Sequence, residues 1–119
     1  MINAQICVDV NNVSIKICKI KYYENSSGDF FYIFTPYYDV INTLDKHIFQ
    51  GIQGIDLSLK KKEYVRKNIV PCFILERSPS ERRNNLKKLV TDIDIKNYKR
   101  LEWLKSTNLR YFGDNLYIV

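Results

Sequence analysis

The stretch from Ile69 to Val90 constrains the fold of this chain more than any other part of the sequence. It begins as an apolar run, passes through Ser78-Pro79 and continues as a strongly basic segment. Ser78 is a favoured N-cap residue, Pro79 suits the first helical position, and the side chain of Glu81 can reach back to the cap. Three independent signals therefore predict a helix from Pro79 to Val90.

The first twenty residues alternate between apolar and polar side chains, which is typical of strands. Residues 2–10 and 13–20 predict two strands, and Asn11-Asn12 between them is a turn signal. In the second strand, the odd positions from Val13 to Ile17 are expected on one face and the even positions on the other. This part of the chain predicts a β-hairpin.

The middle of the chain mixes strand and helix signals. The aromatic run from Phe30 to Thr35 predicts a strand in the core of a sheet. Thr35-Pro36 resembles a helix start, and the apolar spacing that follows predicts a helix from Pro36 to Phe49. Residues 55–59 alternate and predict a short strand, and Lys60-Lys61-Lys62 after it are expected to form a solvated edge.

The last third of the chain predicts further helices and a closing hairpin. A helix is expected to begin near Asn68 and to end before Ser78, with Pro71 in its first turn. Apolar residues between Tyr98 and Leu104 form a third helical stripe, with Trp103 off its centre. Residues 109–112 and 115–119, joined by Gly113-Asp114, predict two paired strands.

These elements together predict an α+β fold. The chain has 119 residues, of which 45% are hydrophobic, and this fits one small domain over residues 1–119 with a single core. We expect a mostly antiparallel sheet of about five strands with three or four helices. Because strands lie at both ends of the chain, we expect the two ends to meet in one sheet, with the helices packed on a face or an edge.

The charge of the chain is unevenly distributed. The net charge is +6, but residues 60–110 hold 15 Lys and Arg against 6 Asp and Glu, a net of +9. This asymmetry favours an acidic partner, either nucleic acid or an acidic protein surface, and a solvated basic surface explains it about equally well. The sequence contains no apolar run long enough to cross a bilayer and no signal peptide, so a cytoplasmic protein is expected.

Catalytic and metal-binding patterns are weak in this sequence. His47 is the single histidine and has no carboxylate or nucleophile at a fixed spacing. The three cysteines form no close pair, and Cys72 beside Pro71 is expected to be an inert buried thiol. Asp92 and Asp94 offer two carboxylates without a third ligand. We therefore expect no catalytic residue, no cofactor and no metal ion.

The basic residues of the last third of the chain are the strongest functional signal in the sequence. With Tyr98 and Trp103 between them, they fit either a phosphate backbone with aromatic stacking or a protein interface. We expect the partner-binding residues to be Arg77, Arg82, Arg83 and Trp103. Tyr98 and Trp103 belong to a helical stripe, which more often means core, but Trp103 lies off its centre and is therefore the candidate for an exposed anchor. The eight basic residues are Arg77, Arg82, Arg83, Lys87, Lys88, Lys96, Lys99 and Arg100.

The order of motifs resembles the N-terminal subdomain of HipA-type toxin kinases. The resemblance covers nearly the whole chain, although each motif is short. The proline that follows the Leu-Ser-Leu segment in that family is absent here, where Lys60 stands. The matching segments are Phe31-Tyr32 to Phe34, Leu57-Ser58-Leu59, Phe73-Ile74-Leu75, Ser78-Pro79 with Arg82-Arg83, Leu101 to Leu104, and Gly113 to Val119.

This resemblance implies a function without chemistry. In the three-gene arrangement of the family, the subdomain is a free-standing small protein, HipS, which acts as the antitoxin. It binds and inhibits a shortened Ser/Thr kinase toxin, HipT, beside the DNA-binding protein HipB. A HipS-like chain would therefore have a HipT-like kinase as its partner, with a HipB-like protein in the same system. The alternative from the charge pattern is a small basic nucleic-acid-binding or phage-type regulatory protein.

Overall fold

The computed structural model describes residues 1–77, 100–108 and 115–119. The predicted helix at Pro79 to Val90, its cap at Ser78, and the predicted strand at residues 109–112 lie outside the described residues. In chain order the described elements are β1 (Ile2–Val10), β2 (Val13–Glu24), β3 (Phe30–Pro36), α1 (Tyr38–Ile41), the 3-10 helix η1 (Leu57–Leu59), β4 (Tyr64–Lys67), α2 (Cys72–Arg77), α4 (Arg100–Thr107) and β5 (Leu116–Ile118).

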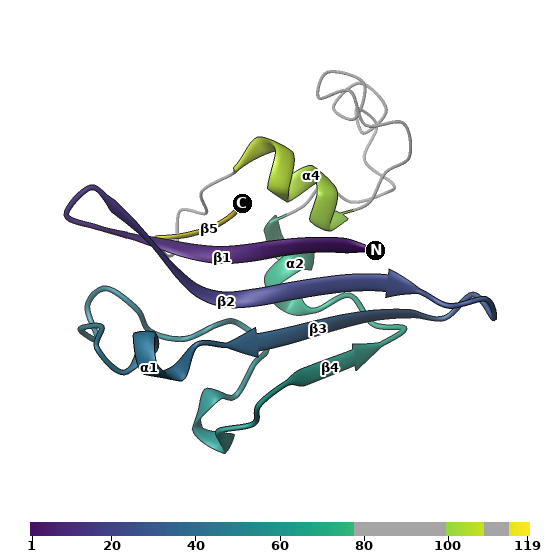
Figure 1. Cartoon of the computed structure of the whole chain (residues 1–119), viewed down its shortest axis with the longest axis horizontal. Coiled ribbons are helices and arrows are strands. Elements are labelled where there is room, and N and C mark those ends of the chain that lie inside the picture. The colour runs from purple at the N-terminus through teal and green to yellow at the C-terminus, as the bar shows by residue number, and fades with distance from the viewer. Residues whose placement is uncertain (78–99, 109–114) are drawn as a thin grey trace.

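The five described strands form one antiparallel sheet in the order β4-β3-β2-β1-β5 (Figure 1). The C-terminal strand β5 pairs with the N-terminal strand β1, with Cys7 opposite Tyr117. The predicted α+β fold with an antiparallel sheet of about five strands is therefore confirmed. The expectation that the two ends of the chain meet in one sheet is confirmed as well.

The β1–β2 hairpin is the longest pairing in the sheet, and it contains a bulge. Ile6 pairs with Cys18 and Cys7 pairs with Lys16, so Ile17 is an extra residue without a partner on β1. Ile17 and Cys18 are both fully buried. The bulge therefore reverses the strict alternation expected for this strand. Before the reversal the core face of β2 carries Ile15 and Ile17, and after it the same face carries Cys18, Ile20 and Tyr22.

One face of the sheet carries the core, and the helices α2 and α4 pack on it. In Figure 1, α2 passes behind β1 and β2. The two helices contribute Phe73, Ile74, Leu101 and Leu104, each no more than 1% exposed. The strands supply the other half of the core: Ala4, Ile6, Val8, Ile17, Cys18, Ile20, Tyr32, Phe34, Tyr64, Leu116 and Ile118.

The predicted helix from Pro36 to Phe49 is wrong for most of its length, because α1 covers only Tyr38–Ile41. The hydroxyl of Thr43 donates to the carbonyl of Val40 at 2.7 Å, and the Asp45 carboxylate accepts from the backbone N–H of His47 at 2.8 Å. Such local side-chain bonds compete with helix propagation. The apolar residues of this region nevertheless pack against the core: Val40, Ile41, Leu44, Ile48 and Phe49. Their spacing therefore predicted their burial correctly, although the helix is not continuous.

The predicted strand at residues 55–59 is also wrong. Leu57–Leu59 form a 3-10 turn, and the Asp56 carboxylate caps it by accepting from the backbone N–H of Ser58. The strand in this region is β4, which lies slightly later in the chain, after the lysine triplet, and was not predicted from the sequence. Tyr64 anchors β4, since its ring is buried and its hydroxyl donates to the Asp56 carbonyl at 2.7 Å.

The expected helix near Asn68 begins later than predicted, at Cys72, directly after Pro71. The third helical stripe is confirmed at Leu101 and Leu104, which lie on α4, whereas Tyr98 lies outside the described residues. Asn68 instead directly follows β4: its side-chain oxygen accepts from the backbone N–H of Phe30 at 3.0 Å, and its amide donates to Asp29 at 2.9 Å. These bonds join the start of β3 to the end of β4.

The sidedness of the sheet can be tested with two phenylalanines of β3. Phe34 is fully buried on the core face, whereas Phe31 lies on the opposite face and is only partly buried. We expect Phe34→Ala to lower the free energy of unfolding by about 3–5 kcal/mol, and Phe31→Ala by about 1–2 kcal/mol. Urea denaturation followed by the fluorescence of Trp103 measures both. Equal losses in the two variants would contradict the assignment of the core face.

Candidate functional site

The two predicted contact residues inside the described structure are buried. Arg77 is 4% exposed and Trp103 is 8% exposed. The guanidinium carbon of Arg77 lies 3.9 Å from the ring centroid of Phe73, one turn earlier on α2. The side chain of Arg77 therefore packs on its own helix, in a cation–π arrangement.

Trp103 is buried because α4 turns most of its surface inward. Leu101, Trp103 and Leu104 are all buried, and Arg100 at the start of the helix is buried as well. The expectation that Trp103 is an exposed anchor is wrong, since burial of the helix extends beyond the predicted apolar stripe. Neither Arg77 nor Trp103 offers an accessible contact surface, and their binding of a partner stays a prediction. Arg82 and Arg83 lie outside the described residues.

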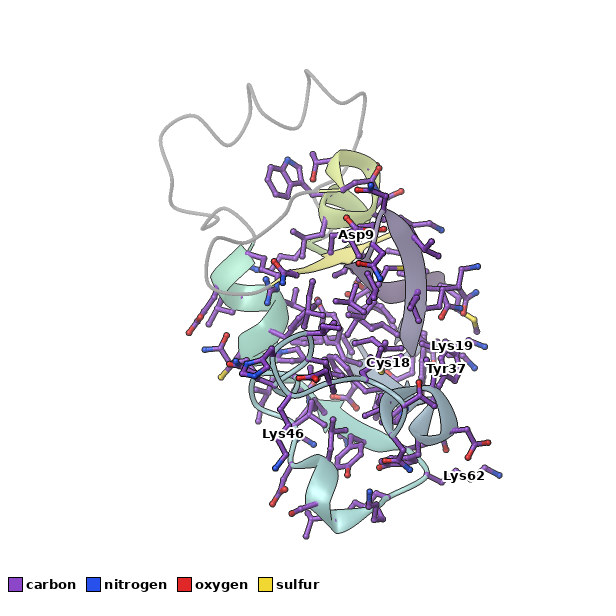
Figure 2. All side chains as sticks on the ribbon, turned by 90° about the vertical axis from the view of Figure 1, so that its left-hand side faces the viewer. Asp9, Cys18, Lys19, Tyr37, Lys46 and Lys62 are labelled. Carbon is purple, nitrogen blue, oxygen red and sulfur yellow. The ribbon has the colours of Figure 1, made fainter. Side chains whose placement is uncertain are left out.

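The face of the sheet opposite α2 and α4 carries a different set of side chains, one that the sequence analysis did not single out. Cross-strand register places Asn3, Lys21, Ile33 and Val65 in one row across four strands. Gln5, Lys19 and Thr35 form a neighbouring row. Figure 2 shows Lys19 and Tyr37 on the side of the sheet away from α2. We call this surface the lysine face.

The bulge at Ile17 brings Lys19 and Lys21 of β2 onto the same face as Lys16. Lys16 is opposite Cys7, Lys19 is opposite Gln5, and Lys21 is opposite Asn3. Strict alternation from Ile15 and Ile17 would place Lys19 and Lys21 in the core. Two consecutive apolar residues, Ile17 and Cys18, between Lys16 and Lys19 were the available signal for a bulge in the sequence.

Aromatic side chains stand at one end of the lysine face. The rings of Tyr23 and Phe31 are stacked, with centroids 4.8 Å apart and an interplanar angle of 13°. The Lys67 ammonium lies 5.8 Å from the centroid of Phe31, on the next strand, and 3.8 Å from the carboxylate of Asp29. The hydrogen bond from Asn68, together with Asn25 and Lys67, lowers the pKa of Asp29. This carboxylate is therefore ionised at neutral pH.

The other end of the lysine face is a small hydrogen-bonded cluster. The hydroxyl of Tyr117 donates to the Asp9 carboxylate at 2.9 Å and is also hydrogen-bonded to the hydroxyl of Ser14. The bond with Ser14 acts to lower the pKa of Tyr117, but burial and Asp9 together raise it. Burial raises the pKa of the neighbouring Cys7 thiol. Apart from Asp9, these groups stay neutral at physiological pH. Their hydrogen bonds hold β5 against the β1–β2 hairpin.

A second basic region lies at the β4 edge. Lys60 and Lys61 lie over the rings of Tyr38 and Tyr64, at 5.3 Å and 6.0 Å from the ring centroids. Burial and the hydrogen bond with Tyr64 raise the pKa of Tyr38 to about 12. The lysine triplet is exposed, as the sequence predicted, but two of its members have aromatic contacts.

Within residues 1–77, 100–108 and 115–119, no three His, Cys, Asp or Glu side chains gather closely enough to hold a metal ion. Asp92 and Asp94 lie outside this part of the chain. His47 is exposed, and its backbone is held by Asp45. No helix in the same ranges has the length and apolar character needed to span a bilayer.

No family model, no curated protein and no solved structure matches the chain.

The cysteines differ from the prediction at one position. Cys7 and Cys18 are buried, whereas Cys72 at the start of α2 is exposed, so its expected burial is wrong. Its place as the first residue of α2, directly after Pro71, leaves its side chain at the surface. Burial raises the pKa of Cys18 to about 12.

We expect one of the three thiols to react quickly with an aromatic disulfide reagent at pH 8, and all three to react in guanidinium chloride. Cys72 is the accessible one, while Cys7 and Cys18 are both buried and hard to ionise. Cys72→Ser should abolish the fast reaction in the folded protein. Fast reaction of two or more thiols in the native state would contradict the described packing.

Proposed function

We propose that this protein is a HipS-like antitoxin, which binds a HipT-like Ser/Thr kinase toxin and inhibits it without catalysing a reaction itself. The observation that carries the proposal is the order of motifs along the chain. The proposed partners are this kinase and a HipB-like DNA-binding protein of the same system, and the proposed location is the cytoplasm.

The described elements follow the order that the resemblance implies. Two strands precede the Phe-rich strand β3, and the Leu-Ser-Leu segment forms the turn η1 before the Phe73-containing helix α2. The Leu-rich helix α4 follows, and β5 is a closing strand. This agreement supports the proposal.

We expect the chain to co-purify with a HipT-like kinase and to restore growth of cells that express the kinase. Stoichiometric addition of the chain should stop autophosphorylation of the kinase in vitro. A kinase that neither binds the chain nor is inhibited by it would remove the basis of the proposal.

The predicted contact pair Arg82 and Arg83 gives the binding test a mutational arm. If either is an interface hot spot, Arg82→Ala with Arg83→Ala should weaken kinase binding by roughly thirty-fold or more, since a hot spot contributes about 2 kcal/mol or more. Lys46→Ala with Lys62→Ala is the matched control, because it removes the same charge at two exposed positions elsewhere in the chain. Equal binding by the two double variants would rule out the arginine pair as a contact.

A small basic nucleic-acid-binding or phage-type regulatory protein is the second candidate, favoured by the net charge of +9 over residues 60–110. In this case a salt-dependent gel shift should disappear in the variant with Arg82→Ala and Arg83→Ala, because phosphate contacts release counterions. A shift that is unchanged in this variant would exclude these arginines as the phosphate contacts.

A further inference from the structure

We propose that the lysine face binds a single strand of nucleic acid, with a base stacked on Tyr23 and the phosphates following Lys21, Lys19 and Lys16 along β2. This inference goes beyond the proposed antitoxin function and does not depend on it. It also uses residues of the sheet, none of which is among the arginines considered above.

The aromatic stack is the first element of this inference. Tyr23, Phe31 and Lys67 lie side by side on β2, β3 and β4. Phe31 is covered on one side by Tyr23 and on the other by the Lys67 ammonium. The pairing of β1 with β2 begins at Ile2 opposite Tyr22, so the neighbour of Tyr23 on β1 is the terminal residue Met1, which is 80% exposed. The stack therefore ends at Tyr23, where a base can extend it in place of the exposed Met1 side chain.

The lysines of β2 provide the second element. Lys21 and Lys19 follow Tyr23 on the same face, and Lys16 continues the line beyond the bulge. Alternate residues of an antiparallel strand are about 6.8 Å apart, which is comparable to the separation of successive phosphates in an extended single strand. A base on Tyr23 would thus place its following phosphates beside a line of ammonium groups.

The acidic residues near this line are already engaged. Asp29 pairs with Lys67 beyond the aromatic end, and Asp9 accepts from Tyr117 at the opposite end. Between them the rows that contain Lys19 and Lys21 hold the neutral side chains of Asn3, Gln5, Thr35 and Ile33. The centre of the lysine face therefore has a positive charge without a neighbouring carboxylate from the paired strands.

The combination of rings and lysines favours a single strand over other acidic partners. A carboxylate of an acidic protein is repelled by the negative face of an aromatic ring, whereas a nucleobase gains by stacking on it. The bases of a duplex are stacked on each other and cannot reach Tyr23. The Gln5 amide oxygen accepts from the Tyr37 hydroxyl at 2.9 Å, which leaves its amide nitrogen as a donor. This nitrogen and the hydroxyl of Thr35, in the same row as Lys19, stand where they can contact a ribose 2′-hydroxyl.

Fluorescence anisotropy with a labelled twelve-nucleotide RNA of mixed sequence tests the proposal on the full chain. We expect this RNA to bind more tightly than a duplex of the same sequence. Single-stranded DNA of the same sequence distinguishes RNA from DNA as the ligand. Weaker binding of DNA than of RNA indicates a contact to the 2′-hydroxyl. Equal binding of the two indicates that the chain contacts bases and phosphates alone. Both results support the proposal, whereas equal binding of the duplex or of polyglutamate overturns it.

Two sets of variants locate the bound strand. Lys19→Ala with Lys21→Ala should reduce the slope of log K against log salt concentration by about 1.4, because each phosphate contact to a single strand contributes about 0.7. Lys46→Ala with Lys62→Ala lowers the net charge equally and should leave the slope nearly unchanged; Figure 2 labels both lysines. Equal slopes in the two double variants would overturn the proposal.

Variants of Tyr23 test whether a base stacks on its ring. Tyr23→Leu should weaken RNA binding by roughly 5- to 150-fold, because stacking of one base is worth about 1–3 kcal/mol. Tyr23→Phe keeps the ring and should bind like the original chain, with circular dichroism used to check folding. If Tyr23→Leu does not fold, the lysine variants and Tyr23→Phe still decide the matter. Normal binding by a folded Tyr23→Leu variant, or weak binding by a folded Tyr23→Phe variant, contradicts the stack as the base contact.

Discussion

The bulge at Ile17 controls the arrangement of side chains across the whole sheet. It allows Ile17 and Cys18, consecutive in sequence, to be buried together, and it reverses the alternation of the remaining half of β2. Every residue after it on β2 therefore faces the opposite way from the position that simple alternation assigns. β2 is the central strand and pairs with both β1 and β3. The reversal therefore fixes which residues of β2 face the core and which lie with Lys16 on the lysine face.

Two charged side chains of the helical layer are buried. Arg77 and Arg100, at the end of α2 and the start of α4, are almost completely buried next to Phe73, Leu101 and Leu104. Arginine tolerates such places better than lysine, because its guanidinium is weakly hydrated and packs on aromatic rings. A count of charges therefore overstates how much of the basic segment is available at the surface, and the described part of the lysine face is a better-defined basic surface.

The two proposals for this chain depend on different kinds of support. The antitoxin proposal depends on the order of motifs and on elements that follow the same order. The single-strand proposal depends on contacts in the sheet, where a stack of Tyr23 on Phe31 adjoins a line of lysines. The two proposals name different residues, since none of the predicted kinase contacts is a residue of the lysine face.

Local sequence determined the hairpin, the Phe-rich strand β3 and the approximate positions of α2 and α4, because period-two alternation, proline and apolar spacing act over a few residues. It also indicated which residues of the region between β3 and η1 are buried, although Thr43 and Asp45 stop the helix that this pattern predicts. Local signals could not decide these details, since side-chain hydrogen bonds to the backbone compete with the regular structure.

Tertiary structure alone decided the pairing of β5 with β1, the use of Tyr64 to anchor an edge strand, the bulge at Ile17 and the burial of Trp103. Each depends on residues far apart in sequence: β5 needs a free edge of β1, and Trp103 needs the surface that α2 and the sheet provide. The lysine face belongs to the same group. Its lysines are visible in the sequence, but only the bulge and the strand register bring them onto one surface beside Tyr23 and Phe31.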